Sequence, residues 1–245
     1  MEAELFGKNL KKKSNFVAII PARKGSKELK NKNIKLLNGH PLIAYSIRAA
    51  IKSKYIKKVF VTTDGAKIAR ISKKYGAKVI NRPKELANDK IISDFAVLHA
   101  INFIEKNYDF EHIIFLQPTS PLRSKNDLDK AIELYVKKKA DCLFSSVEFH
   151  ATMWKSKNFS VKPYHKSFKI VTGRDKTTKN VVDNGSFYIT KKKLFKKYKH
   201  RLAGKNIISY EMEKWSVFEI DSKDDFKIIK WLITSKNKPK SMFLI

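Results

Sequence analysis

The chain has 245 residues, of which 42% are hydrophobic, and carries a formal net charge of +30. This length and hydrophobic content fit one large α/β domain with a real core. No apolar run approaches the roughly 18 residues of a membrane span, so we expect no membrane partner. A single cysteine, Cys142, excludes an internal disulfide framework and any cysteine-based zinc site.

Two further expectations concern the compartment in which the protein works. Cys142 lies in an apolar run, so we interpret it as an inert core thiol. Residues 1–15 are polar and lysine-rich and lack the apolar segment of a signal peptide, so we expect a disordered basic lead. Together these features favour a cytoplasmic location.

The distribution of the positive charge bears on nucleic acid as a partner. Lysines are spread over nearly every predicted helix surface and do not form one stripe. A nucleic-acid footprint is normally clustered on one face or element. The charge therefore does not favour nucleic acid as the main partner, although a general positive field would help to recruit anionic small substrates.

Strands and helices alternate along the chain. The predicted strands are Phe16–Pro21, Lys58–Thr62, Ala77–Ile80, His112–Leu116, Asp141–Val147, Gly185–Ile189 and Val217–Asp221. The predicted helices are 41–51, 66–75, 93–106, 126–138 and one beginning after Ser222. We expect Asp64 to cap the second helix, Gly76 to stop it, and Ser222 with Asp225 to form a capping box for the last. This alternation predicts a mostly parallel sheet with helices on both faces.

The rhythm breaks at about 148–180, which is rich in lysine and aromatic residues. We interpret this segment as an inserted lobe or dimerisation arm. The predicted organisation is thus a single domain over 16–235, interrupted by the arm, and a C-terminal tail over 236–245.

The first candidate site segment is the loop that follows strand Phe16–Pro21. It contains one glycine, one serine and a set of cations. The cations are Arg23, Lys24, Lys27, Lys30 and Lys32. A strand that ends in such a loop is typical of phosphate binding at the carboxyl edge of a parallel sheet. The loop matches neither the P-loop pattern nor the dinucleotide fingerprint, and its alternative interpretation is a solvated surface turn.

Two further segments follow or enter predicted strands. In Leu116-Gln-Pro-Thr-Ser-Pro-Leu-Arg123, two prolines stiffen a loop and place Gln117 and Arg123, so we expect one wall of a site there. In Asp183-Asn-Gly-Ser-Phe-Tyr-Ile189, the glycine permits close approach of a ligand to the backbone, and Tyr188 offers a ring and a hydroxyl. Each could also be an ordinary structural turn.

The fourth segment is Glu219-Ile-Asp221. If it is a strand, its two carboxylates share one face, because side chains alternate along a strand. Oxygen ligands beside a phosphate site suit Mg²⁺. The alternative is an exposed acidic strand end. We interpret His99 and His112 as structural residues, and no serine or cysteine nucleophile arrangement is recognisable.

These segments together resemble the acylneuraminate cytidylyltransferases (CMP-sialic acid synthetases), including relatives that activate legionaminic and pseudaminic acids. The resemblance rests on six ordered motifs that cover nearly the whole chain. They are Ile20-Pro-Ala-Arg-Lys-Gly-Ser-Lys with Lys32-Asn33, Thr63-Asp64-Gly65, Arg82-Pro-Lys-Glu-Leu-Ala, Leu116-Gln-Pro-Thr-Ser-Pro-Leu-Arg123, Asn184-Gly-Ser-Phe-Tyr188 and Glu219-Ile-Asp221. The resemblance implies a three-layer, Rossmann-like nucleotidyltransferase fold and a homodimer whose arm reaches the neighbouring subunit.

The resemblance also implies the reaction and the residues that carry it. CTP and a nine-carbon 2-keto sugar acid would give the CMP-sugar and pyrophosphate, with Mg²⁺ or Mn²⁺. The implied triphosphate ligands are Arg23, Ser26, Lys27 and Lys32, and the implied cytidine contacts are Asn33, Arg82 and Ser93. The implied sugar contacts are Gln117, Lys155, Arg174, Asn184 and Tyr188. Asp221 with Glu219 would hold the metal, and Arg23, Lys27, Lys32 and Asp221 would act in catalysis.

Two departures from the family pattern affect this interpretation. Glu28 stands where a glycine is usual, and we expect its side chain to face solvent, away from the phosphates. Glu219 stands where an aspartate is usual, which would alter the second metal contact. The rival hypotheses are activation of an eight-carbon acid of the KDO type, and a non-catalytic polyanion-binding protein on the same fold. No general base is identified.

Overall fold

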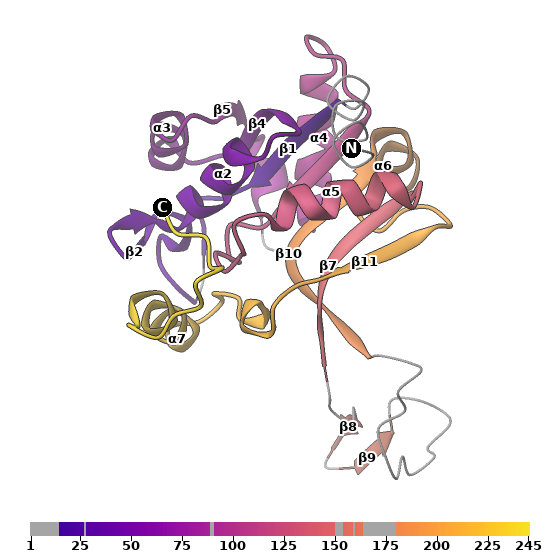
Figure 1. The fold of residues 1–245 in the computed structure, drawn as a ribbon. Coiled ribbons are helices and arrows are strands. Elements are labelled where there is room, and N and C mark those ends of the chain that lie inside the picture. Colours follow the sequence, from indigo (N-terminus) through magenta and orange to yellow (C-terminus); the bar gives the residue numbers. More distant parts are fainter. Residues whose placement is uncertain (1–14, 27, 89–90, 150–153, 159, 164–179) are drawn as a thin grey trace.

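The computed structural model describes residues 15–26, 28–88, 91–149, 154–158, 160–163 and 180–245. A seven-stranded sheet with the order β11-β7-β10-β6-β1-β4-β5 forms its centre (Figure 1). Neighbouring strands pair in parallel except at β10, which is antiparallel to both β6 and β7. The expected mostly parallel α/β fold is confirmed.

The sheet strands, in chain order, are β1 (Phe16–Pro21), β4 (Ile56–Thr63), β5 (Lys78–Asn81), β6 (His112–Leu116), β7 (Cys142–Glu148), β10 (Val181–Lys191) and β11 (Ile207–Glu211). Two small antiparallel pairs lie outside it, β2 (Leu36–Leu37) with β3 (His40–Pro41), and β8 (Trp154–Lys157) with β9 (Ser160–Pro163). The helices are α2 (Leu42–Lys52), α3 (Ala66–Lys74), α4 (Ser93–Ile104), α5 (Asp127–Lys137), α6 (Lys192–Tyr198) and α7 (Lys223–Thr234). Single 3₁₀ turns are η1 (Lys32–Ile34), η2 (Lys84–Ala87) and η3 (Lys214–Val217).

The apolar side chains of β1 alternate between the two faces of the sheet. Phe16, Ala18 and Ile20 pack into one core cluster, beneath residues of α2, α3 and α5. Val17 and Ile19 point the other way, into a cluster with α4 and with Phe195 of α6. A strand buried on both faces must be apolar at every position, and this is why the run Phe16–Ile20 was recognisable as a buried strand.

A third apolar cluster packs α7 against α2. It includes Ile220, Phe226, Ile229 and Ile233, together with Leu42 and Tyr45 of α2. The segment beyond α7 also takes part: Met242 and Phe243 are 3% and 4% exposed. The backbone N–H of Phe243 donates to the Arg123 carbonyl at 2.6 Å, and Ser124 forms an isolated antiparallel β-bridge with Met242. Residues 241–243, within the expected tail, therefore pack against the loop after β6.

Three local expectations proved wrong or incomplete. Residues 217–221 do not form a strand: Val217 is the last residue of η3, and 218–221 follow it without regular structure. A ladder is absent there because Ile220 donates its N–H to Thr119, a loop residue, at 2.8 Å, and its side chain packs against the α7 cluster. Asp64 does not cap α3; its carboxylate accepts the Lys24 N–H at 2.8 Å instead. The edge strand β11 and the helix α6 were not predicted.

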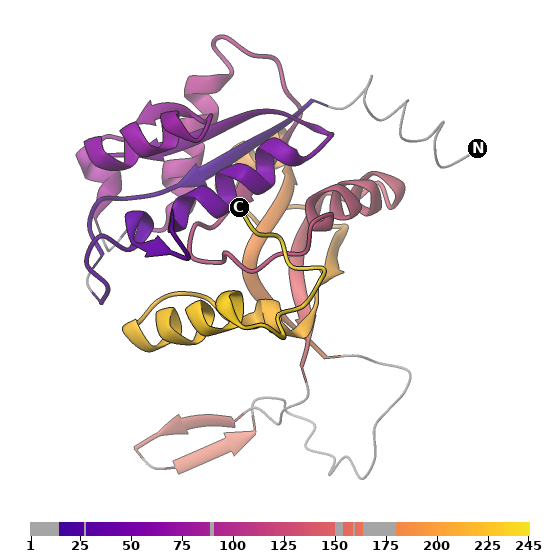
Figure 2. The same cartoon turned by 60° about the vertical axis from the view of Figure 1, so that its left-hand side comes forward.

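The irregular region between β7 and β10 contains the β8–β9 hairpin, which lies apart from the sheet in both views (Figures 1 and 2). Residues 150–153, 159 and 164–179 lie outside the described part of the chain. The proposed role of this segment in dimerisation stays a prediction. Within the described residues, no helix is both long and apolar enough to cross a membrane.

Candidate functional site

A cleft of about 660 Å³ opens at the carboxyl edge of the sheet. Its walls come from the loops that follow β1, β5 and β6 and from the segment before α7. The residues expected at the site that line it are Arg23, Ser26, Lys32, Asn33, Arg82, Ser93, Gln117, Glu219 and Asp221. The carboxyl ends of parallel strands thus bring together residues from distant parts of the sequence, as the sequence analysis predicted.

The basic loop forms one wall and is held by its own polar contacts. The side-chain amide of Asn33 donates to the Arg23 carbonyl at 3.0 Å, which ties the end of the loop to its beginning. Asn33 is 6% exposed and lies in η1. Lys27 falls outside the described residues, so its triphosphate role stays a prediction. Glu28 is exposed, as expected, yet it also lines the cleft.

The acidic wall faces the basic one directly. Lys32 Nζ lies 2.9 Å from Asp221 Oδ1, and the two side chains come from segments 189 residues apart in sequence. The Asp221 side chain is 67% exposed, so its second oxygen is open to a ligand. Arg23 and Asp221 line the same cleft, although Glu219 and Asp221 are not on a strand.

Glu219 has a more enclosed environment than Asp221. The Ser120 hydroxyl donates to Glu219 Oε1 at 2.7 Å. Burial raises the pKa of Glu219, and the nearby charges of Asp221 and Asp183 raise it further, against the opposing effects of the Ser120 hydrogen bond and Lys32. A divalent cation bound here would favour the ionised form, because it supplies positive charge to a site where two carboxylates repel.

The donor set is compatible with Mg²⁺. Glu219 and Asp221 supply carboxylate oxygens at the cleft wall, and Mg²⁺ commonly uses one or two carboxylates with substrate phosphates and water. No group of three or more histidine, cysteine or acidic residues able to hold a metal occurs within the described residues. The two carboxylates would supply two oxygen ligands, and the remaining positions would be filled by water or by a bound ligand.

Gly185 explains how Glu219 and Gln117 come so close to β10. Its φ is +66°, and a Cβ atom placed on it would lie 1.8 Å from Glu219 Oε1 and 2.6 Å from Gln117 Nε2. Only glycine combines this backbone conformation with this space. The glycine thus allows Glu219 and Gln117 to lie against the backbone of β10. The sequence analysis had expected a ligand, not these side chains, to approach the backbone there.

Arg123 is the internal support of the loop after β6. Its side chain is buried, with the residue 1% exposed, and donates to the Ser46 hydroxyl, the Gln117 carbonyl and the Ser186 carbonyl at 3.1, 3.1 and 2.9 Å. Burial lowers its pKa to about 10, partly offset by Asp127 and Glu219. The loop that carries Gln117 is therefore fixed from behind by a charged side chain as well as by its prolines.

Arg82 is a second buried arginine in the wall of the cleft. It is 7% exposed and donates from Nη2 to the Thr62 carbonyl at 2.7 Å. Burial lowers its pKa to about 10, with Asp64 opposing and Arg23 adding to this change. Among the residues that the structure describes, neither Arg82 Nε nor Thr62 Oγ1 has a hydrogen-bond partner. Both atoms are buried, so the guanidinium is held in the wall by the bond from Nη2 to Thr62.

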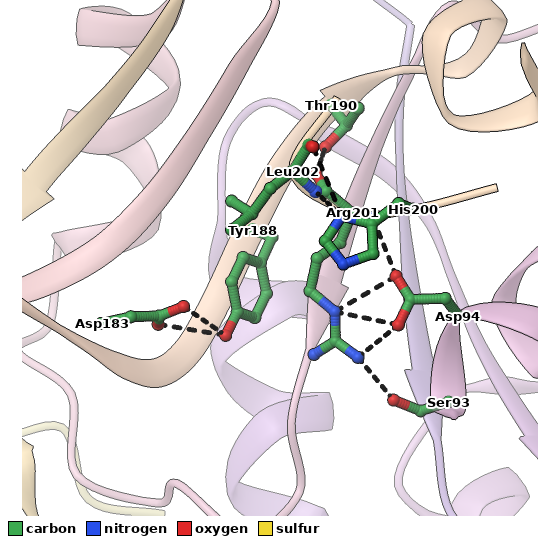
Figure 3. Close-up of polar contacts among 8 residues, drawn as sticks. All are labelled: Ser93, Asp94, Asp183, Tyr188, Thr190, His200, Arg201 and Leu202. Atoms are coloured by element: carbon green, nitrogen blue, oxygen red, sulfur yellow. Dashed lines mark hydrogen bonds and ion pairs between the residues drawn. The ribbon is translucent and has the colours of Figure 1, made fainter. Parts of the chain in front are cut away.

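A polar network that the sequence analysis missed includes Ser93, which lines the cleft (Figure 3). Arg201 contacts Asp94 through Nε and Nη2, and its Nη2 also donates to the Ser93 hydroxyl at 2.7 Å. The Tyr188 hydroxyl donates to both carboxylate oxygens of Asp183, at 3.0 and 2.9 Å. Asp94 and Arg201 are 107 residues apart in sequence, and no local motif marks the pair.

The residues predicted to contact the sugar differ in burial, and not all of them line the cleft. Asn184 is buried, and its amide donates to the Ser216 hydroxyl at 3.0 Å. Tyr188 is 5% exposed, and Lys155 is an exposed residue of β8. Arg174 lies outside the described residues. Gln117 is the predicted sugar contact that lines the cleft, and the other roles stay predictions.

Comparison with known proteins gives a consistent result. Residues 17–242 match a family model described as cytidylyltransferase. The chain is 34% identical to the N-acylneuraminate cytidylyltransferase of Escherichia coli O18:K1:H7, with 93% of this chain and 54% of that protein covered. It is also 34% identical to the post-translational flagellin modification protein B of Campylobacter coli, with 91% and 97% covered.

A pseudaminic acid cytidylyltransferase of Campylobacter jejuni is 34% identical over 70% of this chain and 76% of that protein. The chain spans about half the length of three of the curated relatives it matches, 54%, 56% and 51%. Among solved structures, a CMP:2-keto-3-deoxy-manno-octonic acid synthetase complexed with CTP has a TM-score of 0.65 at 17% identity, covering 90% of this chain and 98% of that one. This last likeness shows the shared fold.

Proposed function

This chain belongs to the cytidylyltransferase family, and from that premise we propose that it activates a nonulosonic acid with CTP, giving the CMP-sugar and pyrophosphate. The relatives named for N-acylneuraminate and pseudaminic acid support a nine-carbon 2-keto acid as the sugar substrate. The observation that carries the proposal is the cleft in which Lys32 and Asp221 lie 2.9 Å apart, with Arg23 on the basic wall and Glu219 on the acidic wall.

The proposed chemistry is an in-line attack by the anomeric hydroxyl of the sugar on the α-phosphate of CTP, with pyrophosphate as the leaving group. Such a transfer depends chiefly on positioning and on neutralising charge. Arg23, Ser26 and Lys32 line the basic wall, where they can bind the β- and γ-phosphates and balance the charge that develops as pyrophosphate leaves. Asn33, Arg82 and Ser93 would hold the cytidine.

A divalent cation held by Asp221 and Glu219 would neutralise phosphate charge and lower the pKa of the attacking hydroxyl. On the sugar side, Gln117 can both donate and accept hydrogen bonds, and its backbone is held by Arg123. Asn184 and Tyr188 would contribute to the same wall from β10, and Lys155 and Arg174 from the segment that precedes it. A homodimer and a cytoplasmic location belong to the same proposal.

The direct test is pyrophosphate release from CTP in the presence of Mg²⁺ and a panel of sugar acids. The panel contains N-acetylneuraminate, legionaminate, pseudaminate and the eight-carbon acid KDO. We expect release with at least one nine-carbon acid and little with KDO. Release with KDO alone would establish the rival eight-carbon substrate, and no release with any acid would refute the proposal.

The matched variants are Asp221→Asn and Asp224→Asn. Asp221 faces the cleft, whereas Asp224 is 80% exposed and pairs with Lys227 on the surface. We expect Asp221→Asn to lower kcat by roughly 100-fold or more, with an unchanged melting temperature, and Asp224→Asn to retain activity. Equal activity of the two variants would exclude the metal role of Asp221.

The polyanion-binding hypothesis has its own test. It predicts salt-dependent binding to DNA at physiological ionic strength without CTP turnover. Measuring DNA binding by fluorescence anisotropy between low and high salt, alongside the turnover assay, separates the two hypotheses.

A further inference from the structure

Arg201 is held rigidly at both its backbone and its side chain. Its N–H donates to Asp94 Oδ1 at 2.7 Å. Its carbonyl accepts from the Thr190 hydroxyl at 2.6 Å and from Cys142 Sγ at 3.1 Å. Thr190 and Cys142 lie on β10 and β7, so the central sheet fixes the backbone from which the Arg201 side chain projects.

The guanidinium is fixed as firmly as the backbone. It lies over the rings of Phe115 and Tyr188, 4.2 and 4.9 Å from their centroids. Asp94, whose side chain is 2% exposed, accepts from Nε and Nη2 (Figure 3). A planar guanidinium stacked on aromatic rings and joined to a carboxylate at two nitrogens has a defined orientation, which lysine could not reproduce.

This arrangement determines what the Ser93 hydroxyl can do. Arginine has no acceptor, so Ser93 Oγ must accept the hydrogen from Arg201 Nη2. The single hydrogen of the hydroxyl is then left for another acceptor, and none is recorded within the part of the chain that the structure describes. Ser93 is the first residue of α4, but it makes no capping bond there, and it lines the cleft.

The surroundings of Ser93 suit a nucleobase better than a phosphate. The nearest lining residues in sequence, Leu86, Asn88 and Ile91, are uncharged, and Phe115 adds a ring. Arg82 is the charged lining residue of this stretch, and the other cations and the carboxylates of the cleft come from segments around Lys32 and Asp221. A wall with few charges and one oriented hydroxyl donor would recognise a base through a ring acceptor.

We propose that Arg201 is a positioning residue that fixes the Ser93 hydroxyl as a donor toward N3 of the base and thereby makes the cleft prefer cytosine to uracil. Cytosine has an acceptor at N3 for the Ser93 hydrogen, whereas uracil has an N–H there. Ser93 Oγ could accept that N–H with its second lone pair, but its own hydrogen would then have no acceptor on the base. An unpaired polar group in a desolvated site lowers affinity for the wrong ligand. The inference rests on the proposed use of CTP and extends it to the origin of base selection.

The test measures binding of CTP and UTP by calorimetry, with a steady-state assay beside it. We expect Ser93→Ala to weaken CTP binding roughly 10-fold and to leave UTP binding nearly unchanged. Arg201→Lys keeps a cation beside Asp94 but loses the planar guanidinium that contacts both Asp94 and Ser93. We expect it to lower the ratio of CTP affinity to UTP affinity to a similar extent. In the steady-state assay the change should appear in KM more than in kcat. The double variant should be no more affected than either single one.

Ser93→Thr is the rescue variant, because it restores the hydroxyl while Asp94 and Arg201 stay in place. We expect it to regain most of the preference for CTP. If Arg201 had a purely structural role, its substitution would lower the melting temperature and weaken the binding of CTP and UTP equally. Its effect would then add to that of Ser93→Ala. That result would overturn the inference. If Arg201→Lys does not fold, an unchanged CTP-to-UTP ratio in Ser93→Ala overturns it alone.

The binding measurement also separates this inference from the proposed reaction. Selective CTP binding that depends on Ser93 and Arg201, without turnover of any sugar acid, would support the inference and refute the reaction. Turnover of a sugar acid with a CTP-to-UTP ratio that neither variant changes would support the reaction and refute the inference.

Discussion

The two edges of the central sheet use charged residues in opposite ways. At the amino edge, just before β7, Asp141 accepts from Lys191 Nζ at 2.6 Å and from the N–H groups of Lys205 and Asn206 at 3.0 and 3.2 Å. At the carboxyl edge, Asp221 is paired with Lys32 yet remains 67% exposed in an open cleft. At the amino edge the carboxylate of Asp141 is fully engaged by groups of the protein, whereas at the carboxyl edge the carboxylate of Asp221 is still accessible to a ligand.

The pKa values follow the same division. Hydrogen bonds from Lys191, Asn206 and Lys205 lower the pKa of Asp141 to about 2, whereas burial and neighbouring carboxylates raise the pKa of Glu219. A lowered carboxyl pKa means that the folded state stabilises the charge it contains. A raised one means that the site lacks positive charge, which a ligand can supply.

The largest effect should come from filling the space beside Gly185. In Gly185→Ala, the new methyl group would meet Glu219 Oε1 and Gln117 Nε2, and alanine would be held at a φ of +66°. We expect turnover to fall by roughly 100-fold, because small displacements of positioned groups are costly to catalysis, and we expect a loss of about 1–2 kcal/mol in stability from the backbone strain. Steady-state kinetics and urea unfolding measure the two effects.

Gly39→Ala is the matched control for that variant. Its φ is +81°, but a Cβ there would meet nothing within 4 Å. We expect a similar loss of stability with full activity. Equal losses of activity in the two alanine variants would show that backbone strain, not crowding at the cleft, explains the effect of Gly185→Ala.

His112 at the amino edge should dominate acid sensitivity. It stacks on Phe16, lies 3.1 Å from the Tyr135 hydroxyl, and burial together with Lys191 lowers its pKa to about 4. The unfolded chain binds a proton near pH 6.5, so stability is full above that pH and is lost as pH falls from 6.5 toward 4, by about 3 kcal/mol in total. His112→Phe should remove this dependence.

The measurement for His112 is the free energy of unfolding in urea at several pH values. At pH 7 the variant should lose only about 1 kcal/mol, from the hydrogen bond to Tyr135, and its activity should be unchanged. A variant that keeps the full slope between pH 6.5 and 4 would show that other groups carry the acid sensitivity.

The smallest effect should come from Asp141→Asn. Its pKa is lowered in the fold, so its contribution is present above about pH 4 and is lost as pH falls toward 2. We expect a loss of about 1 kcal/mol at pH 7, since its side chain is partly exposed and solvent screens the pair. The difference from the parent protein should narrow at pH 3, and activity should not change. A cleft defect in this variant would contradict the division between the two edges.

The sequence predicted the fold where burial leaves an unambiguous pattern. The run Phe16–Ile20 could only be a strand covered on both faces, and the Ser222–Asp225 capping box formed as expected. The alternation in 217–221 favoured a strand, but η3 and the packing of Ile220 under α7 override it. The edge strand β11 is short and half-exposed, so its pattern was too weak to recognise.

For the site, the sequence placed residues that follow strands better than those that act at a distance. Arg23, Gln117 and Asp221 each belong to a compact local motif, and all three line the cleft. Arg201 follows a lysine-rich helix and carries no local signal. Its importance comes from Asp94 and Ser93, which approach it only after the chain has folded.

The bridge between Ser124 and Met242 has a consequence for biosynthesis. Domains generally fold as the chain emerges from the ribosome, N-terminal parts first. The loop that carries Gln117 is synthesised well before Phe243, yet the carbonyl of Arg123 obtains its partner only when Phe243 has been made. The cleft loop therefore completes its backbone contacts only after the segment beyond α7 has been translated, although most residues of the cleft are translated earlier.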